Sequence, residues 1–385
     1  MIFSLPNFKN FAKEHTATFV AGIIFVLVIA GAMYAFLTAK PDYNVLQEAL
    51  YNGNYLQVIE SAEKFLAKNP EDLALIHLLA GAYLSEATVT GSPVWQNRSV
   101  AFLIDQMKKY PDDAELLRLR GYYYFLVGAY DLAERFYQQS ANIDQTNSLT
   151  WSSLGLLYER KGNFLKASSL YDKALAIDPN DQIANVGKIR NLFRGNKSAE
   201  ARSSAADFLL KTKDALTKAA IYEMLGLDAL SVNNYEKAEE YLNSALSLNP
   251  NLPISLASYA LAMYSNIIRG PLDDLPTKLA KPEALALEAI AIKPNYAFAY
   301  AVLSRIAKLK GDDQKAKEYG AKVLSSLAYD DLTPKADKVA LKKSFDTTTP
   351  AISNIKIISI KKADASSLGP TASTTGIIII NKSRQ

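Results

Sequence analysis

Apolar residues recur every three or four positions along most of the chain, in stretches that short polar turns separate. This spacing places the apolar side chains on one face of an α-helix. Turn-forming sequences such as Lys161-Gly162-Asn163 and Val232-Asn233-Asn234 stand between successive stretches. The pattern therefore predicts an all-α fold, with pairs of amphipathic helices over residues 39–330.

The predicted helix pairs repeat at a fixed period. Gly121 and Gly155 stand 34 positions apart, and Pro111 and Pro179 stand 68 positions apart. Glycine within a helix costs about 1 kcal/mol relative to alanine, so its recurrence indicates a close approach by a neighbouring helix. Proline ends the second helix, because the residue before proline avoids the helical region. Such a period is typical of a solenoid whose units stack on their neighbours.

Two units carry a complete set of small, apolar and aromatic residues and resemble the tetratricopeptide repeat family. The unit at 148–181 has Trp151, Leu154, Gly155, Tyr158, Ala167, Tyr171, Ala174 and Pro179. The unit at 219–252 has Tyr222, Leu225, Gly226, Ala229, Ala238, Leu242, Ala245 and Pro250. Less complete units occupy 39–72, 73–113, 114–147, 182–218, 253–296 and 297–330. The resemblance implies a right-handed superhelical solenoid of about eight helix hairpins.

Residues 18–37 form an uncharged apolar stretch before the repeats. About twenty such residues in a helix span about 30 Å, the hydrocarbon thickness of a bilayer. Lys9 and Lys13 precede the stretch, and Lys40 follows it. The small excess of positive charge before the stretch predicts a cytoplasmic N-terminal segment, residues 1–17, and repeats on the non-cytoplasmic side. We therefore predict a single-pass membrane protein.

A cleaved signal peptide is the alternative interpretation of this stretch. Ala30-Gly31-Ala32 resembles a small-residue cleavage site after an apolar core. However, apolar residues continue through Leu37, which is long for such a signal and favours the anchor.

One further helix is predicted in residues 331–346, directly after the repeats. It would cover the last unit, which would otherwise expose its core. At helical spacing, Ala336, Val339 and Ala340 are expected to face inward.

The remaining residues, 347–385, form a tail of different character. Residues 355–360 and 376–381 have the composition of short strands, but two strands alone are marginal in water. The tail is therefore predicted to be partly β or disordered.

Charge is unevenly distributed along the chain. The net charge is +4, and the segment from Asp331 onward carries nine Lys or Arg against four Asp, so the repeats are close to neutral. A solenoid that binds nucleic acid should carry a basic stripe along its body. We therefore predict that nucleic acid is not a partner.

No pattern typical of catalysis or metal binding is present. The absence of cysteine excludes disulfides, thiolate zinc sites and cysteine nucleophiles. The two histidines, His15 and His77, stand far apart, and the sequence has no zinc-protease, nucleophile-elbow, phosphate-loop or dinucleotide motif. We therefore predict no enzyme activity, no cofactor, no metal and no small-molecule substrate.

Two units have extra residues between their helices, near 85–97 and at 269–281. Inserts in a solenoid form loops on one face and sometimes bind partners. Trp95 in the first insert could serve that purpose, or it could pack back onto a helix end.

In the tetratricopeptide family, positions 2, 5, 9 and 12 of each first helix line a concave groove. The resemblance assigns to that groove Arg118, Tyr122, Phe125, Leu156, Ile183, Arg190, Phe193, Leu227, Tyr264, Phe298 and Arg305. Apolar side chains alternate there with arginines, which suits a protein or peptide segment with apolar anchors and some acidic groups. Alternatively, several of these side chains pack against the first helix of the next unit.

These observations predict a membrane-anchored scaffold or adaptor that binds partner proteins and assembles an envelope-associated complex. One alternative is a chaperone-like or translocon-associated module that binds apolar segments of exported proteins. A second alternative is an accessory subunit of an enzyme complex. A repeat array is a binding architecture, and the fold alone does not name its partner.

Overall fold

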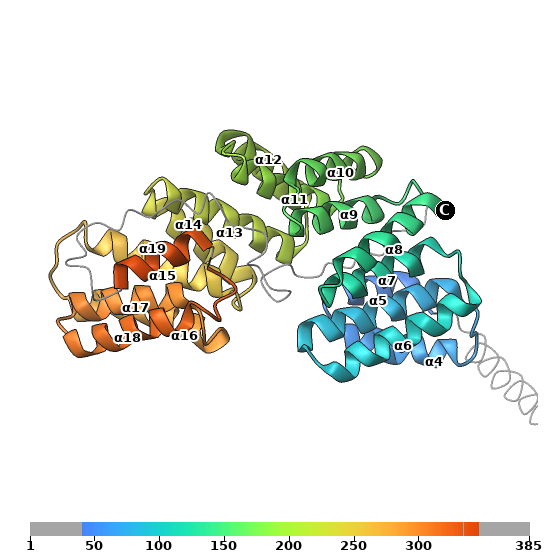
Figure 1. Cartoon of the computed structure of the whole chain (residues 1–385), viewed down its shortest axis with the longest axis horizontal. Coiled ribbons are helices and arrows are strands. Elements are labelled where there is room, and N and C mark those ends of the chain that lie inside the picture. Colours follow the sequence, from blue (N-terminus) through green and yellow to red (C-terminus); the bar gives the residue numbers. More distant parts are fainter. Residues whose placement is uncertain (1–40, 334, 346–385) are drawn as a thin grey trace, which may run out of the picture. The chain divides into compact units, whose positions relative to one another are not determined.

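A computed structural model describes residues 41–333 and 335–345 of this 385-residue chain. Every regular element in those residues is an α-helix, so the all-α prediction is confirmed there (Figure 1). In order, the helices are α3 (Tyr43–Tyr51), α4 (Tyr55–Leu66), α5 (Leu73–Thr90), α6 (Pro93–Lys109), α7 (Ala114–Leu126), α8 (Tyr130–Ile143), α9 (Ser148–Arg160), α10 (Phe164–Ile177), α11 (Gln182–Arg194), α12 (Ser198–Lys211), α13 (Ala215–Ser231), α14 (Tyr235–Leu248), α15 (Pro253–Ile267), α16 (Leu275–Ile292), α17 (Ala297–Leu309), α18 (Asp313–Ser326) and α19 (Lys335–Phe345). The predicted membrane stretch and the predicted strands lie outside the described residues.

The chain divides into two compact units, Met1–Leu79 and Ala80–Gln385, whose boundary falls within α5. In the first unit, α3 packs on α4, and Asp72 links α3 to the start of α5. Tyr43 Oη donates to Asp72 Oδ2 over 2.5 Å, and Asp72 Oδ1 accepts from the backbone N–H of Leu75 over 3.2 Å. Burial and the Asp72 carboxylate raise the pKa of Tyr43 to about 12.

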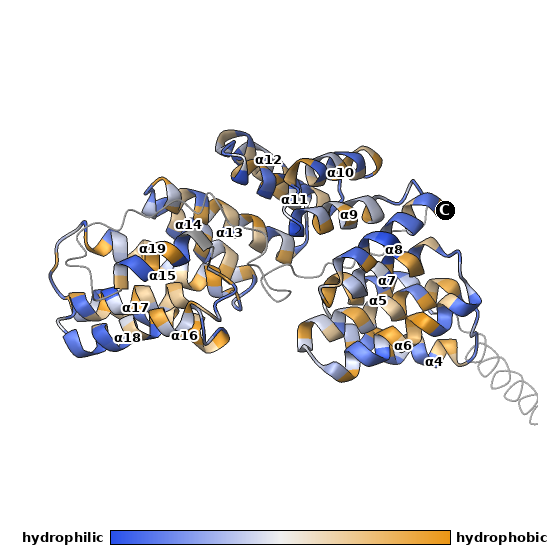
Figure 2. Ribbon diagram, in the orientation of Figure 1, coloured by the Kyte–Doolittle hydropathy of each residue, from blue (hydrophilic) through white to orange (hydrophobic). Residues whose placement is uncertain are grey.

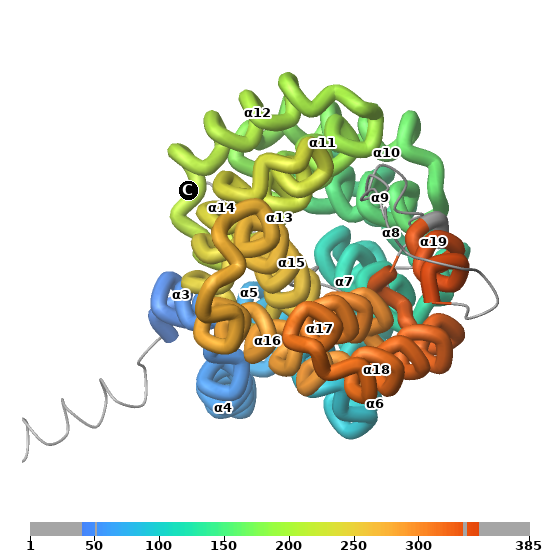
Figure 3. Tube along the Cα trace, turned by 90° about the vertical axis from the view of Figure 1, so that its left-hand side faces the viewer, coloured from blue at the N-terminus to red at the C-terminus, as the bar shows by residue number. Residues whose placement is uncertain are grey.

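After the end of α5 and α6, the second unit continues as six helix pairs from α7 to α18. The first helices are α7, α9, α11, α13, α15 and α17, and each packs on the second helix that follows it. Each first helix also contacts the first helix of the next pair, and each second helix contacts the following first helix. The first helices therefore form a continuous layer, which can be followed along the tube in Figure 3. This arrangement is an all-helical solenoid.

Burial differs between the two helices of a pair. Most residues of α9 are buried, whereas in α10 only Ala167, Tyr171 and Ala174 are. A first helix has neighbours in its own pair and in both adjacent pairs, so more of its circumference is covered. Figure 2 shows the contrast in composition, with α18 largely hydrophilic and α15 much more apolar.

Glycines in the first helices leave room for large side chains of the second helices. A Cβ atom on Gly121 would lie 2.6 Å from Tyr137 Cδ1, and one on Gly226 would lie 2.5 Å from Leu242 Cγ. Such distances are too short for carbon atoms in contact. The close approach expected from the sequence is therefore present, and an aromatic or leucine side chain makes it.

The insert predicted near residues 85–97 is not a loop, because it lengthens two helices. α5 continues to Thr90 and α6 starts at Pro93. The ring of Trp95 lies 6.1 Å from that of Tyr83, and the Arg98 guanidinium lies 5.3 Å from the Trp95 ring. Trp95 thus packs back onto α5, as the alternative interpretation expects.

The second predicted insert, at 269–281, is only partly a loop. α15 ends at Ile267, and α16 already begins at Leu275 with a proline in its first turn. Proline is tolerated there because the first-turn N–H groups have no intrahelical acceptor.

By length and composition, α5 is the one helix in the described residues that could cross a membrane. About 61% of it is buried within the protein. A helix buried on most sides in a repeat array is apolar for packing reasons. We therefore interpret α5 as a core helix.

Helix α19 covers the end of the second unit and contacts both α17 and α18 (Figures 1 and 3). Leu341 and Phe345, one turn apart, pack with Val323 and its neighbours. Val339 is 69% exposed, so the prediction that it faces inward was wrong. Apolar residues at helical spacing occur on two faces of α19. The face with the larger side chains, Leu341 and Phe345, is the one that packs against the array.

Candidate functional site

The eleven residues assigned to the groove lie on the first helices of the second unit, and we call this surface the first-helix face. Two of them, Arg118 and Phe125, are buried in the packing. The other nine are half-buried: Tyr122, Leu156, Ile183, Arg190, Phe193, Leu227, Tyr264, Phe298 and Arg305. Half-buried side chains keep surface that a partner could cover.

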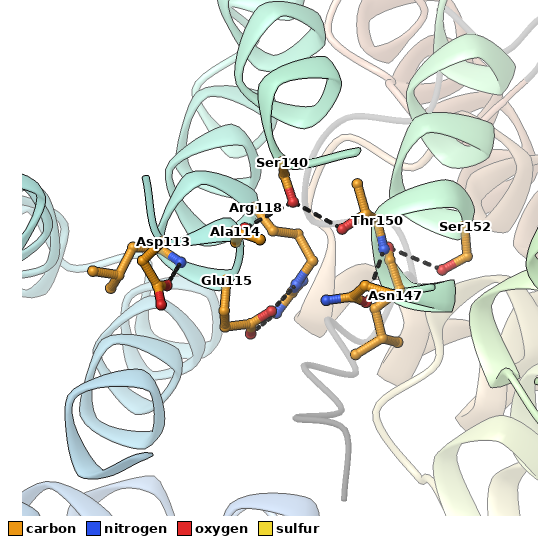
Figure 4. Close-up of polar contacts among 10 residues, drawn as sticks. Asp113, Ala114, Glu115, Arg118, Ser140, Asn147, Thr150 and Ser152 are labelled. Atoms are coloured by element: carbon orange, nitrogen blue, oxygen red, sulfur yellow. Dashed lines mark hydrogen bonds and ion pairs between the residues drawn. The ribbon is translucent and has the colours of Figure 1, made fainter. Parts of the chain in front are cut away.

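Arg118 on α7 is only 3% exposed and binds Glu115 one turn earlier (Figure 4). Its Nε donates to Glu115 Oε2 over 2.7 Å, and its Nη2 donates to Oε1 over 2.6 Å. Burial alone would lower the pKa of Arg118, but the Glu115 charge raises it above its ordinary value. The buried pair is neutral overall, and Arg118 serves the packing of α7.

Polar contacts next to Arg118 join three helices (Figure 4). Ser140 Oγ on α8 donates to the carbonyl of Ala114 on α7 over 2.7 Å, and it shares a 2.9 Å hydrogen bond with Thr150 Oγ1 on α9. Asn147 Oδ1 accepts from the backbone N–H of Thr150 and caps α9. These contacts fix the start of α9 against the preceding pair.

Glu159 at the end of α9 is a buried carboxylate, 3% exposed, that neutralises a second arginine of the predicted groove. It accepts from Tyr171 Oη over 2.7 Å, from Arg190 Nη1 over 3.0 Å and from Arg194 Nη1. Burial would raise the pKa of Glu159, but Arg190, Arg194 and Tyr171 together hold it below its ordinary value. The ionised carboxylate therefore links α9, α10 and α11.

Glu159 stands at position 12 of its first helix, which is also one of the family's groove positions, and the sequence carries a signal for its ion pair. Arg190 stands 31 positions after Glu159, close to one repeat length. In a solenoid, such a spacing places two first-helix residues at the same level of adjacent pairs. An acid and an arginine at that separation predict an ion pair.

The apolar residues of the first-helix face fall into separate groups. Tyr122, Leu156 and Ile183 pack against one cluster of buried residues of α7–α11. Phe193 packs on the cluster of α11–α13, and Leu227 packs on that of α13–α15. The structure thus brings only part of the predicted set together.

Tyr264, Phe298 and Arg305 lie on the last two first helices, α15 and α17. Tyr264 and Phe298 pack against the same buried cluster of α15–α17. Arg305 lies on α17, half-buried, and makes no hydrogen bond or ion pair with any residue that the structure describes. Burial lowers the pKa of Arg305, and Tyr264 and Tyr235 only partly offset that shift.

Within residues 41–333 and 335–345, no group of three or more His, Asp or Glu side chains is placed to hold a metal ion. Asp273, in the loop before α16, binds Lys278, and that pair is exposed to solvent. The predicted absence of cofactor and metal stays a prediction.

Family comparison addresses the repeats directly. One family model, described as tetratricopeptide repeat, matches residues 148–181, and a second with the same description matches residues 219–252. The chain contains tetratricopeptide repeats. The two matches coincide with the α9–α10 and α13–α14 pairs, where the sequence pattern is complete.

Relatives match only part of their own length. An uncharacterized protein, ycf37, of Porphyra purpurea is 29% identical over 110 residues, 29% of this chain and 62% of that protein. The peroxisomal targeting signal receptor of Saccharomyces cerevisiae is 24% identical over 202 residues, 51% of this chain and 32% of that protein. These matches therefore cover less than two thirds of either relative.

A solved structure supports the same architecture. The crystal structure of the APC/C hetero-tetramer Cut9–Hcn1 aligns with a TM-score of 0.61 at 14% sequence identity, covering 77% of this chain and 53% of that chain. At this identity the likeness shows the fold of the tetratricopeptide repeat array and nothing about its partners.

Proposed function

We propose that this tetratricopeptide repeat protein is a scaffold, not an enzyme, and that it binds a segment of a partner protein on its first-helix face. The half-buried apolar side chains along that face carry the proposal, among them Tyr122, Ile183, Phe193, Tyr264 and Phe298. Aromatic residues bury large areas at little entropic cost, and they are enriched among residues that dominate binding energy. The targeting-signal receptor among the relatives supports a protein ligand.

We propose further that residues 18–37 hold the repeats at a membrane, with residues 1–17 in the cytoplasm. The uncharged length of that stretch and the lysines before it support this arrangement. A scaffold held there would assemble an envelope-associated complex.

Site-specific photocrosslinking in intact cells tests the binding face. A photoreactive phenylalanine analogue replaces Phe193 or Tyr264 in the full chain, and a matched variant carries it at Lys237, an exposed residue on α14. We expect one discrete adduct from Phe193 or Tyr264 that is absent from the Lys237 variant. Mass spectrometry of the adduct then names the partner.

Other outcomes separate the alternatives. A continuous smear of adducts from the first-helix face would favour the chaperone-like function, in which many apolar segments bind transiently. Equal labelling from Lys237, or no adduct from either first-helix position, would contradict binding on this face.

A further inference from the structure

Three arginines were assigned to the groove, and the structure distinguishes them by their partners. Arg118 is neutralised by Glu115, and Arg190 is neutralised by Glu159. Only Arg305 has no carboxylate from the described part of the chain. Of these three arginines, Arg305 is therefore the one whose charge no carboxylate of the described residues neutralises.

The surroundings of Arg305 make an unpaired charge costly. It is half-buried on α17, on the same helix as Leu303 and Ile306, which belong to a buried apolar cluster. Removing a guanidinium from water without a counter-charge is unfavourable, which is why its pKa is lowered there. A counter-charge supplied by a partner would recover that cost.

The guanidinium can also be reached from outside the protein. Some polar side-chain atoms in the described residues have no hydrogen-bond partner and no contact with solvent, such as Arg120 Nε and both amide atoms of Asn191. No atom of Arg305 belongs to this group. The guanidinium nitrogens of Arg305 therefore keep some surface that is accessible from solvent.

We propose that Arg305 is the recognition residue for an acidic side chain, aspartate or glutamate, within the bound partner segment. This inference rests on the proposed function. A planar guanidinium matches a carboxylate through two parallel hydrogen bonds. Phe298 and Tyr264, which pack on one apolar cluster of α15–α17, offer contacts for an apolar residue near the acid in the partner sequence.

Phosphodiester and C-terminal ligands fit this surface less well. A nucleic acid strand needs a series of basic residues, whereas the first helices also carry the buried carboxylates Glu159 and Glu223. A C-terminal carboxylate is held in some members of the tetratricopeptide family by lysine and asparagine on adjacent first helices. The corresponding positions here include Tyr122, Ile183 and Gly187. A single arginine without an acidic partner in the described residues suits one internal side chain.

A displayed library of random twelve-residue peptides, selected on the full-length chain in detergent, tests the proposal. Selections run in parallel on wild type, Arg305→Gln and Arg135→Gln. Arg135 is an exposed arginine on α8, so its replacement makes the same charge change away from the first-helix face. We expect apolar peptides enriched in Asp or Glu on wild type and Arg135→Gln, and apolar peptides without that enrichment on Arg305→Gln.

A double-mutant cycle then tests direct contact. A selected peptide and its acid-to-amide version are titrated by fluorescence anisotropy against wild type and Arg305→Gln. Each single change should weaken binding by about tenfold or more, and the second change should add little once the first is made. Amidating the peptide C-terminus should leave affinity unchanged. Thermal unfolding of Arg305→Gln should match or exceed that of wild type, because an unpaired charge is removed.

The outcomes separate the two proposals. Peptide affinity could fall in Phe298→Ala but stay unchanged in Arg305→Gln. In that case the proposed contact between Arg305 and an acidic side chain is wrong, and the proposed binding on the first-helix face stands. If affinity depends on the terminal carboxylate of the peptide, the proposal that Arg305 recognises an internal acidic side chain is wrong. The same proposal is wrong if a single-stranded RNA 20-mer binds through Arg305 and no peptide does. If no peptide is selected on wild type, both proposals fail.

Discussion

At the scale of single residues, Tyr171 connects the helix packing to the charges of the first-helix face. Its ring lies between Gly155 of α9 and Gly187 of α11, and its hydroxyl donates to Glu159. A Cβ on Gly155 would lie 2.6 Å from Tyr171 Cδ1, and one on Gly187 would lie 2.7 Å from its Oη. Two helices and one ion cluster therefore depend on a single buried ring.

Replacing Gly187 with alanine should destabilise the repeats. The added methyl would overlap the Tyr171 ring, which cannot withdraw without losing its place against Gly155 and Glu159. We expect the free energy of unfolding to fall by about 2–3 kcal/mol, measured by urea denaturation. Gly270→Ala is the control, because its nearest atoms are two backbone oxygens at 3.8 Å. Equal midpoints for both variants would show that the ring is not tightly held.

Replacing Glu159 with glutamine should destabilise the protein in a pH-dependent way. At neutral pH the change leaves Arg190 and Arg194 without their shared counter-charge, at a cost of about 3 kcal/mol. The folded-state pKa of Glu159 lies below its ordinary value of 4.5, so its stabilising effect is complete above that pH. The effect is lost as the pH falls through the folded-state pKa.

The difference in unfolding midpoint between wild type and Glu159→Gln should therefore be largest near pH 7 and shrink in acid. Glu200→Gln removes an exposed ion pair with Lys197 and should cost under about 0.5 kcal/mol. A Glu159 effect as small as the Glu200 effect, or one that grows in acid, would contradict the assignment.

At the scale of elements, α19 is joined to the array partly through Asp330, in the segment before it. Asp330 Oδ2 accepts from the backbone N–H of Ala297 at the start of α17 over 2.9 Å, and its Oδ1 accepts from the backbone N–H groups of Leu332 and Thr333. One buried carboxylate thus fixes the approach to α19 and satisfies the first turn of another helix.

Asp337 on α19 makes the docking of this helix sensitive to pH. Burial raises the pKa of Asp337 to about 6 from its ordinary value of 3.8. A raised carboxyl pKa means that the folded state is penalised above about pH 6, and the penalty disappears as the pH falls toward 4. Asp337→Asn should therefore stabilise α19 at pH 8 by about 1 kcal/mol, after allowance for solvent screening, and have no effect at pH 4.

Hydrogen exchange of the α19 amides at the two pH values measures this effect. Asp207→Asn, on an exposed position of α12, is the control and should change nothing at either pH. Equal protection of wild type and Asp337→Asn at pH 8 would show that the carboxyl is hydrated in the folded state.

At the scale of the whole molecule, the second unit is a chain of nearest-neighbour contacts. Each pair packs on the next through its first helix, so a disturbance in one pair reaches its neighbours before the rest. Ion pairs such as Glu159 with Arg190 and Arg194 join adjacent pairs and add to that coupling. An incoming segment bound across several pairs would be held by a layer that is already ordered.

The proposed anchor predicts how the full chain partitions. The full-length protein should stay with the membrane pellet after alkaline carbonate extraction, whereas a variant without residues 18–37 should be released. N-terminal sequencing of the mature protein separates the alternatives, because cleavage after Ala32 would give a chain that starts at Met33. Release of the full chain with an intact N-terminus would contradict the anchor.

The sequence by itself determined the fold class and the repeat register. Helix formation and the 34-residue period are local properties, so the complete units at 148–181 and 219–252 could be predicted with their helix pairs. The resemblance to tetratricopeptide repeats also gave the prediction that certain first-helix positions line a binding groove.

Only the tertiary structure decided what each residue on that face does. Whether an arginine is neutralised depends on side chains of its own and neighbouring pairs. Glu159 reaches Arg190 and Arg194, whereas no carboxylate of the described residues reaches Arg305. The inward face of α19 was likewise set by packing, since two apolar stripes competed and Leu341 was buried while Val339 was left exposed. Local periodicity fixes where a side chain can point, but the groups brought beside it come from distant parts of the chain.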